Sequence, residues 1–205
     1  MIKEEATLEI SAAAVKELRD KTGSGVMECR NALIKAEGNM EMAQTILKQK
    51  GVEKADKKKD RETNQGRIES YIHMGRIGVL LELNCETDFV AKTDQFQNLA
   101  KELAMQIAAQ GPLYVSRDKI PSEVYEKEKE AIRKSVEEGG KPQDIVEKIV
   151  EGRLNKYLGK ICLLEQSYIR DEDKKVADLI KDVIAQTGEN IVINRFTRYA
   201  LGETD

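Results

Sequence analysis

The residues that could do covalent chemistry are few and far apart. The chain has one histidine, His73, so a Cys/His or Ser/His mechanism would have to use it. If Gly75 turns a hairpin, His73 pairs near Ile77, and Cys85 lies eight residues further along that strand. At ~3.3 Å per residue this separation is about 26 Å, which is too far for the two side chains to react. We therefore predict that the protein is not an enzyme and interpret His73 first as an ordinary strand residue.

Metal ligation is not indicated either. The three cysteines, Cys29, Cys85 and Cys162, are odd in number, widely separated and without a C-x-x-C pair, so neither a disulfide framework nor a zinc site is predicted. Acidic residues gather in the segment 82–94, but they lack the ligand spacing and the central glycine of a calcium-binding EF-hand loop. We expect no metal and no cofactor.

The charge pattern argues against nucleic acid as a direct partner. The 34 basic and 37 acidic residues give a net charge of −3, so no overall positive field would attract a polyanion. The one basic cluster, KADKKKDR at 54–61, is interleaved with acidic residues and has no aromatic residues on which bases could stack. It is better explained as a solvated face, although an RNA-binding factor that uses this cluster stays an alternative.

The sequence shows no sign of membrane insertion or export. The stretch MIKEEATLEISAAAV lacks a basic region followed by an apolar core. No apolar run approaches the ~18 residues that are needed to cross a bilayer. We expect a cytoplasmic protein that makes no membrane contacts.

The most unusual pair of residues is Asp88 followed by Phe89, within LNCETDFVAKTDQF at 83–96. The chain has only three Phe and no Trp, yet this Phe lies at a turn and outside any core pattern. In one interpretation Thr87 or Asp88 caps a short helical turn and Phe89 plugs the sheet edge. In the other, Phe89 is exposed, as in protein recognition, where a ring fills a partner's pocket while an acid sets the register. The local sequence leaves both open.

Three short helices are predicted in the N-terminal region. Ser11 is a suitable N-cap for the first, a second follows the TGSG break, and Asn39 caps a third that carries apolar residues up to Gly51. The segment 53–66 mixes both charges and is interpreted as a helical extension that frays into a linker. The predicted domains are therefore a three-helix binding module at 1–52, a charged linker at 53–66 and a core domain at 67–205.

After the linker the hydrophobic period changes to two. RIESYIHM at 67–74 alternates apolar with polar or aromatic residues, and RIGVLLEL at 76–83 is apolar at every second position, with Gly75 between them as a hairpin turn. The segments KICLLEQSYI at 160–169 and ENIVINRFTRYAL at 189–201 are interpreted as two further strands.

Helical periods fill the rest of the C-terminal region. Thr93 is a suitable cap for an amphipathic helix that ends at QGP, and KKVADLIKDVIAQTG at 174–188 has an apolar stripe of the same period. Helices over about 122–138 and 142–158, separated by GGKP, form a predicted hairpin. The predicted fold class is α+β: a small three-helix module, then an antiparallel sheet with helices on one face and a projecting helical hairpin.

Three long motifs cover most of the chain: VKELRDKTGSGVMECRNAL from Val15, YIHMGRIGVLLELNCETDFVAK from Tyr71 and KIVEGRLNKYLGKICLLEQSYI from Lys148. Together, and in this order, they resemble the bacterial translation elongation factor Ts family. The resemblance implies an N-terminal domain of the ubiquitin-associated type followed by a core dimerisation domain.

The resemblance also implies guanine-nucleotide exchange on elongation factor Tu. In that family the factor binds the GDP form, displaces Mg²⁺, stabilises the nucleotide-free GTPase and leaves when GTP has entered. No covalent chemistry is needed. Exchange is a coupling free energy, so GDP must weaken the binding of the factor as much as the factor weakens the binding of GDP.

Family motifs assign the implied partner-binding residues one by one. The family's Thr-Asp-Phe-Val segment intrudes into the GTPase domain near the Mg²⁺ site, where a small displacement of ligands weakens the nucleotide because Mg²⁺ demands near-ideal octahedral geometry. The motifs TGSGVM and YIHMGRIG are associated with further contacts. The implied residues are Thr87, Asp88, Phe89 and Val90, with Val26, Met27 and His73 as further contacts.

One feature departs from the long members of the family, which carry two tandem copies of the core sheet motif. This chain has a single merged copy, so we expect a two-fold homodimer that binds two elongation factor Tu molecules. The C-terminal strand from Ile191 is the expected interface. The alternative to exchange is an adaptor of the ubiquitin-associated type, in which the core only supports the small module.

Overall fold

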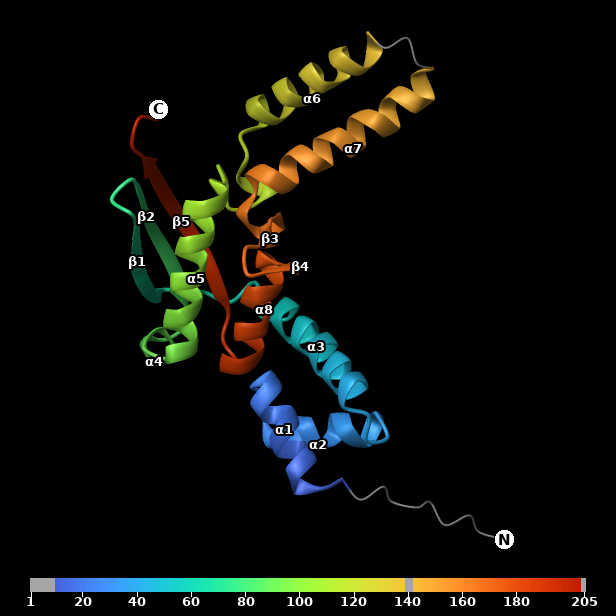
Figure 1. The fold of residues 1–205 in the computed structure, drawn as a ribbon, viewed down its shortest axis with the longest axis vertical. Coiled ribbons are helices and arrows are strands. Elements are labelled where there is room, and N and C mark those ends of the chain that lie inside the picture. The colour runs from blue at the N-terminus through green and yellow to red at the C-terminus, as the bar shows by residue number, and fades with distance from the viewer. Residues whose placement is uncertain (1–9, 139–141, 204–205) are drawn as a thin grey trace.

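The computed structural model describes residues 10–138 and 142–203. Three helices lie at one end of the molecule, a sheet with helices packed beside it lies in the middle, and a long helical hairpin projects at the other end (Figure 1). The first nine residues of the predicted N-terminal module, and most of the GGKP break, lie outside the described residues.

The N-terminal helices are α1 (Ala12–Thr22), α2 (Val26–Lys35) and α3 (Met40–Asp56). Two of the caps that the sequence predicts are present: the Ser11 side chain accepts a hydrogen bond from the backbone N–H of Ala14, and that of Asn39 from Met42. The helices bury a small apolar core of their own, which consists of Val15, Leu18, Cys29, Ala32, Leu33, Ala36, Ala43 and Leu47.

Helix α3 continues beyond this small core. At Gly51 it passes so close to the helix that follows the fourth strand that an added Cβ would lie 3.1 Å from the Cβ of Ala185. Four residues later, Ala55 is buried in the main apolar core. The helical extension that the sequence predicts after Gly51 is thus present as far as Asp56 and packs against the core.

The main sheet has three antiparallel strands in the order β1-β2-β5: β1 (Gln65–His73), β2 (Ile77–Cys85) and β5 (Ile191–Ala200). His73 pairs with Ile77, as the hairpin interpretation predicts, and Gly75 lies in the turn with φ +68°. Glycine adopts this left-handed conformation without the steric cost that a Cβ would add. The α+β class is confirmed.

One face of this sheet is covered and the other is open. Val79, Leu81 and Leu83 of β2 are buried on the covered face. Because β1 pairs with β2 in a fixed register, Glu69 and Tyr71 share that face, since they lie opposite Leu81 and Val79. The isoleucines of β1 lie on the open face instead. The exposed apolar residues of this open face are Ile68, Ile72, Leu80, Val192 and Tyr199.

Two helices cover the sheet. The first is α5 (Asp94–Gln110), which packs across β1 and β2, and the second is α8 (Val176–Thr187), which packs against α5 and α3. The predicted Thr93 cap of α5 is present, because the Thr93 side chain accepts a hydrogen bond from Phe96 N–H. A four-residue helix, α4 (Asp88–Ala91), joins β2 to α5.

The predicted helical hairpin is formed by α6 (Ser122–Glu137) and α7 (Gln143–Ile161). The prediction of a strand over 160–169 is wrong for most of its length. Helix α7 runs to Ile161, a 3₁₀ turn follows at Leu163–Glu165, and only the short β3 (Ser167–Tyr168) pairs with β4 (Asp171–Lys175). In the apolar run CLL, Cys162 and Leu163 are buried and Leu164 is half-buried, because the run joins the hairpin to the core, so its apolar character does not require a strand.

Candidate partner-binding site

Residues 87–91, which we call the tip, follow β2 directly. Thr87 is the N-cap of α4, because its side chain accepts a hydrogen bond from the backbone N–H of Val90 at 3.4 Å. Asp88 and Phe89 occupy the first two helical positions and point to solvent, and Val90 is buried in the main core. Within this single turn, two residues thus face solvent and the next one is buried.

Phe89 is the residue that the fold itself does not need. Its side chain is 79% exposed, whereas complete burial of a phenylalanine stabilises a protein by about 1.5–3 kcal/mol. Of the two sequence interpretations, the Thr87 cap is confirmed, but the idea that Phe89 plugs the sheet edge is wrong. A ring held in water at a helical turn is available to fill a pocket of another molecule.

The N–H, the hydroxyl and the carbonyl of Thr87 all form hydrogen bonds. Its N–H donates to Glu189 Oε2 at 3.0 Å, and its hydroxyl donates to Glu189 Oε1 at 2.7 Å. Its carbonyl accepts from the thiol of Cys85 at 3.1 Å. Burial and the nearby Glu189 raise the pKa of this thiol to about 11, so the thiol stays protonated at neutral pH and can donate. The base of the tip is therefore fixed, while Asp88 and Phe89 are exposed to solvent.

Asp88 carries the tip's negative charge. Its carboxylate accepts a hydrogen bond from Lys92 Nζ at 2.7 Å, and this contact lowers the pKa of the carboxyl group below its usual value. Both side chains are largely exposed, so the pair adds little to stability. A partner could take either member of the pair without leaving a buried charge behind.

Val26 and Met27 lie in the first turn of α2, and both are exposed. Together with Ile10, Val15 and the stem of Arg30 they line a shallow, mainly apolar groove on the module. Val15 belongs to the module core, and Val26 and Met27 do not. Val26 and Met27 are thus surface residues and do not pack in the module core.

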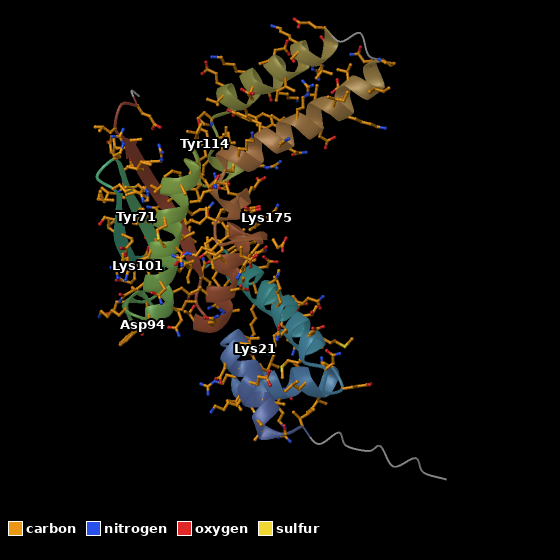
Figure 2. All side chains as sticks on the ribbon, in the orientation of Figure 1. Lys21, Tyr71, Asp94, Lys101, Tyr114 and Lys175 are labelled. Atoms are coloured by element: carbon orange, nitrogen blue, oxygen red, sulfur yellow. The ribbon has the colours of Figure 1, made fainter. Side chains whose placement is uncertain are left out.

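His73 is remote from the tip. It lies at the turn end of β1, exposed, with Nδ1 3.0 Å from the Tyr71 hydroxyl oxygen. The tip follows the other end of β2, about 26 Å away at ~3.3 Å per residue. In Figure 2, Tyr71, which precedes His73 by two residues, is labelled on the sheet, and Asp94, which follows the tip, is labelled at the lower end of α5. A single small ligand could not contact both places.

Comparison with known proteins identifies the family. The family model "Elongation factor TS" matches residues 3–203. A curated protein named Elongation factor Ts from Caldanaerobacter subterraneus subsp. tengcongensis is 56% identical over 195 residues, which covers 95% of this chain and 98% of that protein. Another of the same name, from Thermotoga petrophila, is 56% identical over 197 residues and covers 96% and 98%.

The chain belongs to the elongation factor Ts family. A third relative of that name, from Thermodesulfovibrio yellowstonii, is 54% identical over 195 residues, with 95% of this chain and 98% of the relative covered. The resemblance that the three sequence motifs indicated is confirmed. Membership places the chain among the elongation factors of protein biosynthesis.

In this member of the family the charged segment 53–66 is tied to its surroundings. Lys54 pairs with Glu28 of α2, Lys58 donates to the carbonyl of Gly188, and Arg61 lies 3.5 Å from Glu86. These three cations of the basic cluster thus have partners within the protein. An RNA-binding surface would have them directed outward.

Sequence reasoning missed Glu189. This carboxylate precedes β5 and accepts both hydrogen bonds from Thr87, which is 102 residues earlier in the chain. No local pattern marks such a residue, because a lone Glu after a helix-ending glycine is an ordinary surface residue in most sequences. Only the pairing of β5 with β2, which places Ile191 opposite Cys85, brings the two together.

Two further findings concern ligands and membranes. Across residues 10–138 and 142–203, no helix combines the length and the apolar character that a membrane crossing requires. Nor does this described part of the chain gather three or more His, Cys, Asp or Glu side chains in a way that would hold a metal ion.

Proposed function

We propose that the protein is a guanine-nucleotide exchange factor for elongation factor Tu and acts in the cytoplasm. One observation carries the proposal: Phe89 and Asp88 project from a turn whose base is fully hydrogen-bonded, within a member of the elongation factor Ts family. A rigid base with an exposed ring is suited to entering another protein. No covalent step by this chain is required.

In the proposed mechanism, the ring of Phe89 wedges between elements of the GTPase beside its Mg²⁺ site. Asp88 positions the wedge through polar contacts, and Thr87 and Val90 hold it from below. Because Mg²⁺ tolerates little distortion of its octahedral shell, displacement of a ligand weakens both the ion and GDP. Each tenfold weakening of GDP requires ~1.4 kcal/mol of contacts that exist only in the nucleotide-poor complex.

The groove with Val26 and Met27 supplies a second contact in this proposal. An apolar groove rimmed by Lys16, Arg19 and Arg30 suits a surface on the GTPase that offers apolar and acidic side chains. His73 would contact the partner at a separate place on the sheet, since it lies at the far end of the β1-β2 hairpin. The groove and His73 would add affinity for the partner, and the tip would displace the Mg²⁺ ligand.

The experiment measures release of a fluorescent GDP analogue from purified elongation factor Tu at fixed Mg²⁺. We compare the wild-type chain with Asp88→Ala plus Phe89→Ala, and use Asp94→Ala plus Gln95→Ala as the matched control. Strong acceleration by wild type and control, with a loss of at least about 10-fold in the tip variant, supports the proposal. A folded wild type that does not accelerate release overturns it.

The same experiment decides the adaptor alternative. An adaptor of the ubiquitin-associated type would bind through α1 and α2 and would leave GDP release unchanged. A repeat in excess EDTA tests the Mg²⁺ step separately. When the ion is already removed, the advantage of wild type over the tip variant should shrink, because the tip then has no Mg²⁺ to displace.

We also propose that two copies of the chain form a homodimer. The sequence expectation points to the strand from Ile191, and this strand, β5, is an edge of the sheet. Beside that edge lies the open face, with Ile68, Leu80 and Tyr199 exposed. An apolar face can pack against its own copy across a two-fold axis, so a second copy could cover both the β5 edge and the open face.

Leu80→Lys tests the dimer. A lysine in the centre of the open face would carry a charge into the interface, so the variant should have half the molar mass of wild type in sedimentation equilibrium. Met74→Lys, at the exposed hairpin turn, is the control and should leave the mass unchanged. A wild-type chain that sediments as a monomer at micromolar concentration overturns the dimer proposal and leaves the exchange proposal untouched.

A further inference from the structure

The carboxylate of Glu189 is half-buried in the short connection between α8 and β5. We propose that Glu189 is the positioning residue of the tip: it holds Thr87 and thereby fixes the direction in which Phe89 projects. The effect on GDP release rests on the proposed function, whereas the effect on the conformation of the tip does not.

The geometry supports a two-point attachment. The two oxygens of one carboxylate accept from two different donors of Thr87, its N–H at 3.0 Å and its hydroxyl at 2.7 Å. Hydrogen bonds to a charged acceptor are stronger than those between neutral groups. Two of them on one residue fix both its position and its rotation.

The tip needs an anchor of this kind. Helix α4 has only four residues, far below the ~12–15 residues at which an isolated helix becomes even marginally stable in water. Phe89 contributes little burial, so the side chains that hold the turn are Val90 and Thr87, with Ala91 partly buried against the core. Val90 fixes the depth of the turn in the core, and the contact between Thr87 and Glu189 fixes its orientation.

Glu189 is itself held in place. It follows Gly188, which ends α8 with φ +78°, and its own N–H donates to the hydroxyl of Thr187 at 3.4 Å. Its neighbour Asn190 donates from its backbone N–H to Glu86 Oε1 at 2.7 Å. The Asn190 side chain also donates to the carbonyls of Lys59 and Arg61, at 3.2 and 2.9 Å. The backbone that carries the carboxylate is therefore tied to the end of α8, to Glu86 and to the segment 59–61.

Removal of the carboxylate should free the tip without unfolding the protein. In Glu189→Ala the Thr87 N–H and hydroxyl lose their acceptors, and water or a rotated turn must replace them. Phe89 keeps its ring but samples several directions. A group that is displaced by about 1 Å can lose as much as 10²-fold in rate, so we expect the maximal rate of GDP release to fall about 10-fold.

The first measurement is amide hydrogen exchange of Thr87 in the free chain. Protection should be lost in Glu189→Ala, partly kept in Glu189→Gln, which retains one acceptor oxygen, and unchanged in Glu172→Ala, an exposed carboxylate on β4. Circular dichroism and urea unfolding verify that each variant is folded. Unchanged protection of Thr87 in Glu189→Ala overturns the inference, whether or not the protein is an exchange factor.

The second measurement uses GDP release at increasing factor concentration. A positioning role predicts a lower maximal rate in Glu189→Ala with a nearly unchanged half-saturating concentration, and partial recovery in Glu189→Gln. In a Phe89→Ala background, Glu189→Ala should have no further effect, because there is no ring left to position. An equal additional loss in that background overturns the inference. If wild type itself fails to accelerate release, the proposed function fails, and Thr87 protection alone decides the role of Glu189.

Discussion

Two helical turns in the stretch 87–96 share the pattern Thr-Asp-x-apolar but expose different residues. The first is Thr-Asp-Phe-Val at 87–90, and the second is Thr-Asp-Gln-Phe at 93–96. In both, the threonine side chain caps the helix by accepting from the residue three positions later, and that residue is buried. In both, the second helical residue is exposed: Phe89 in one turn and Gln95 in the other.

The comparison separates what the fold requires from what it does not. A cap, an acid at the first position and a buried apolar residue at the third position are shared, so they account for a stable turn. Glutamine at the exposed position is what local physics favours. Phenylalanine there has no structural reason, and this difference supports the proposal that Phe89 is the working group of the tip.

The largest expected effect is on stability, at the buried phenylalanine of the second turn. Phe96→Ala removes a fully buried ring and should lower the free energy of unfolding by about 3–5 kcal/mol. Phe89→Ala, its counterpart in the same stretch, should change it by less than about 0.5 kcal/mol, because the ring is in water. Urea unfolding of both variants measures the difference. Equal losses would show that Phe89 packs against the protein in solution.

The next effect concerns function. Phe89→Gln gives the first turn the residue that its counterpart carries, so the turn should keep its fold and its stability. GDP release from elongation factor Tu should slow about 30-fold at limiting factor, which corresponds to the ~2 kcal/mol of a typical aromatic hot spot. A variant with wild-type exchange would show that the exposed ring is not the working group.

A smaller effect is expected at the shared cap. Thr93→Ala removes the acceptor for Phe96 N–H at the start of α5 and should cost about 1 kcal/mol of unfolding free energy. GDP release should be unchanged, because α5 stays packed on β1 and β2. Thermal unfolding and the release assay together test this. A loss of exchange at full stability would mean that the second turn also contacts the partner.

The smallest effect is expected from the reverse exchange, Gln95→Phe. A second exposed ring, on the neighbouring turn, should alter the unfolding free energy by no more than about 0.5 kcal/mol. It should not rescue GDP release in a Phe89→Gln background, because its turn points to a different place. Rescue would indicate that any exposed aromatic in this stretch suffices.

The positions of most helices and strands could be predicted from caps and hydrophobic periods. Which face of a strand is covered could not. Ser11, Asn39 and Thr93 were recognisable as caps because their interactions are local. The covered face of β1 could not be predicted from β1 alone, since Ile68 and Ile72 suggest the opposite side. The pairing of His73 with Ile77 would have resolved it, because this register places the isoleucines opposite Glu82 and Gly78.

The site was predictable in part for the same reason. The exposed pair Asp88 and Phe89 could be noticed from its residue types, and the Thr87 cap from its position before a helical turn. Glu189 could not be noticed, because its contact with Thr87 exists only in the folded chain. Likewise the CLL run at 162–164 is apolar enough for a strand, but it packs at the base of the hairpin and against the main core instead.

The continuity of α3 has a consequence for the thermodynamics of binding. Because Ala55 is buried in the main core and Gly51 packs closely on α8, the groove on the module and the tip belong to one body without a flexible tether between them. If both surfaces bind elongation factor Tu, as proposed, then once one has bound, the other is already presented at a high effective concentration. The conformational entropy of fixing the groove relative to the tip is lost once, during folding. It is therefore not lost again each time the protein associates with a partner.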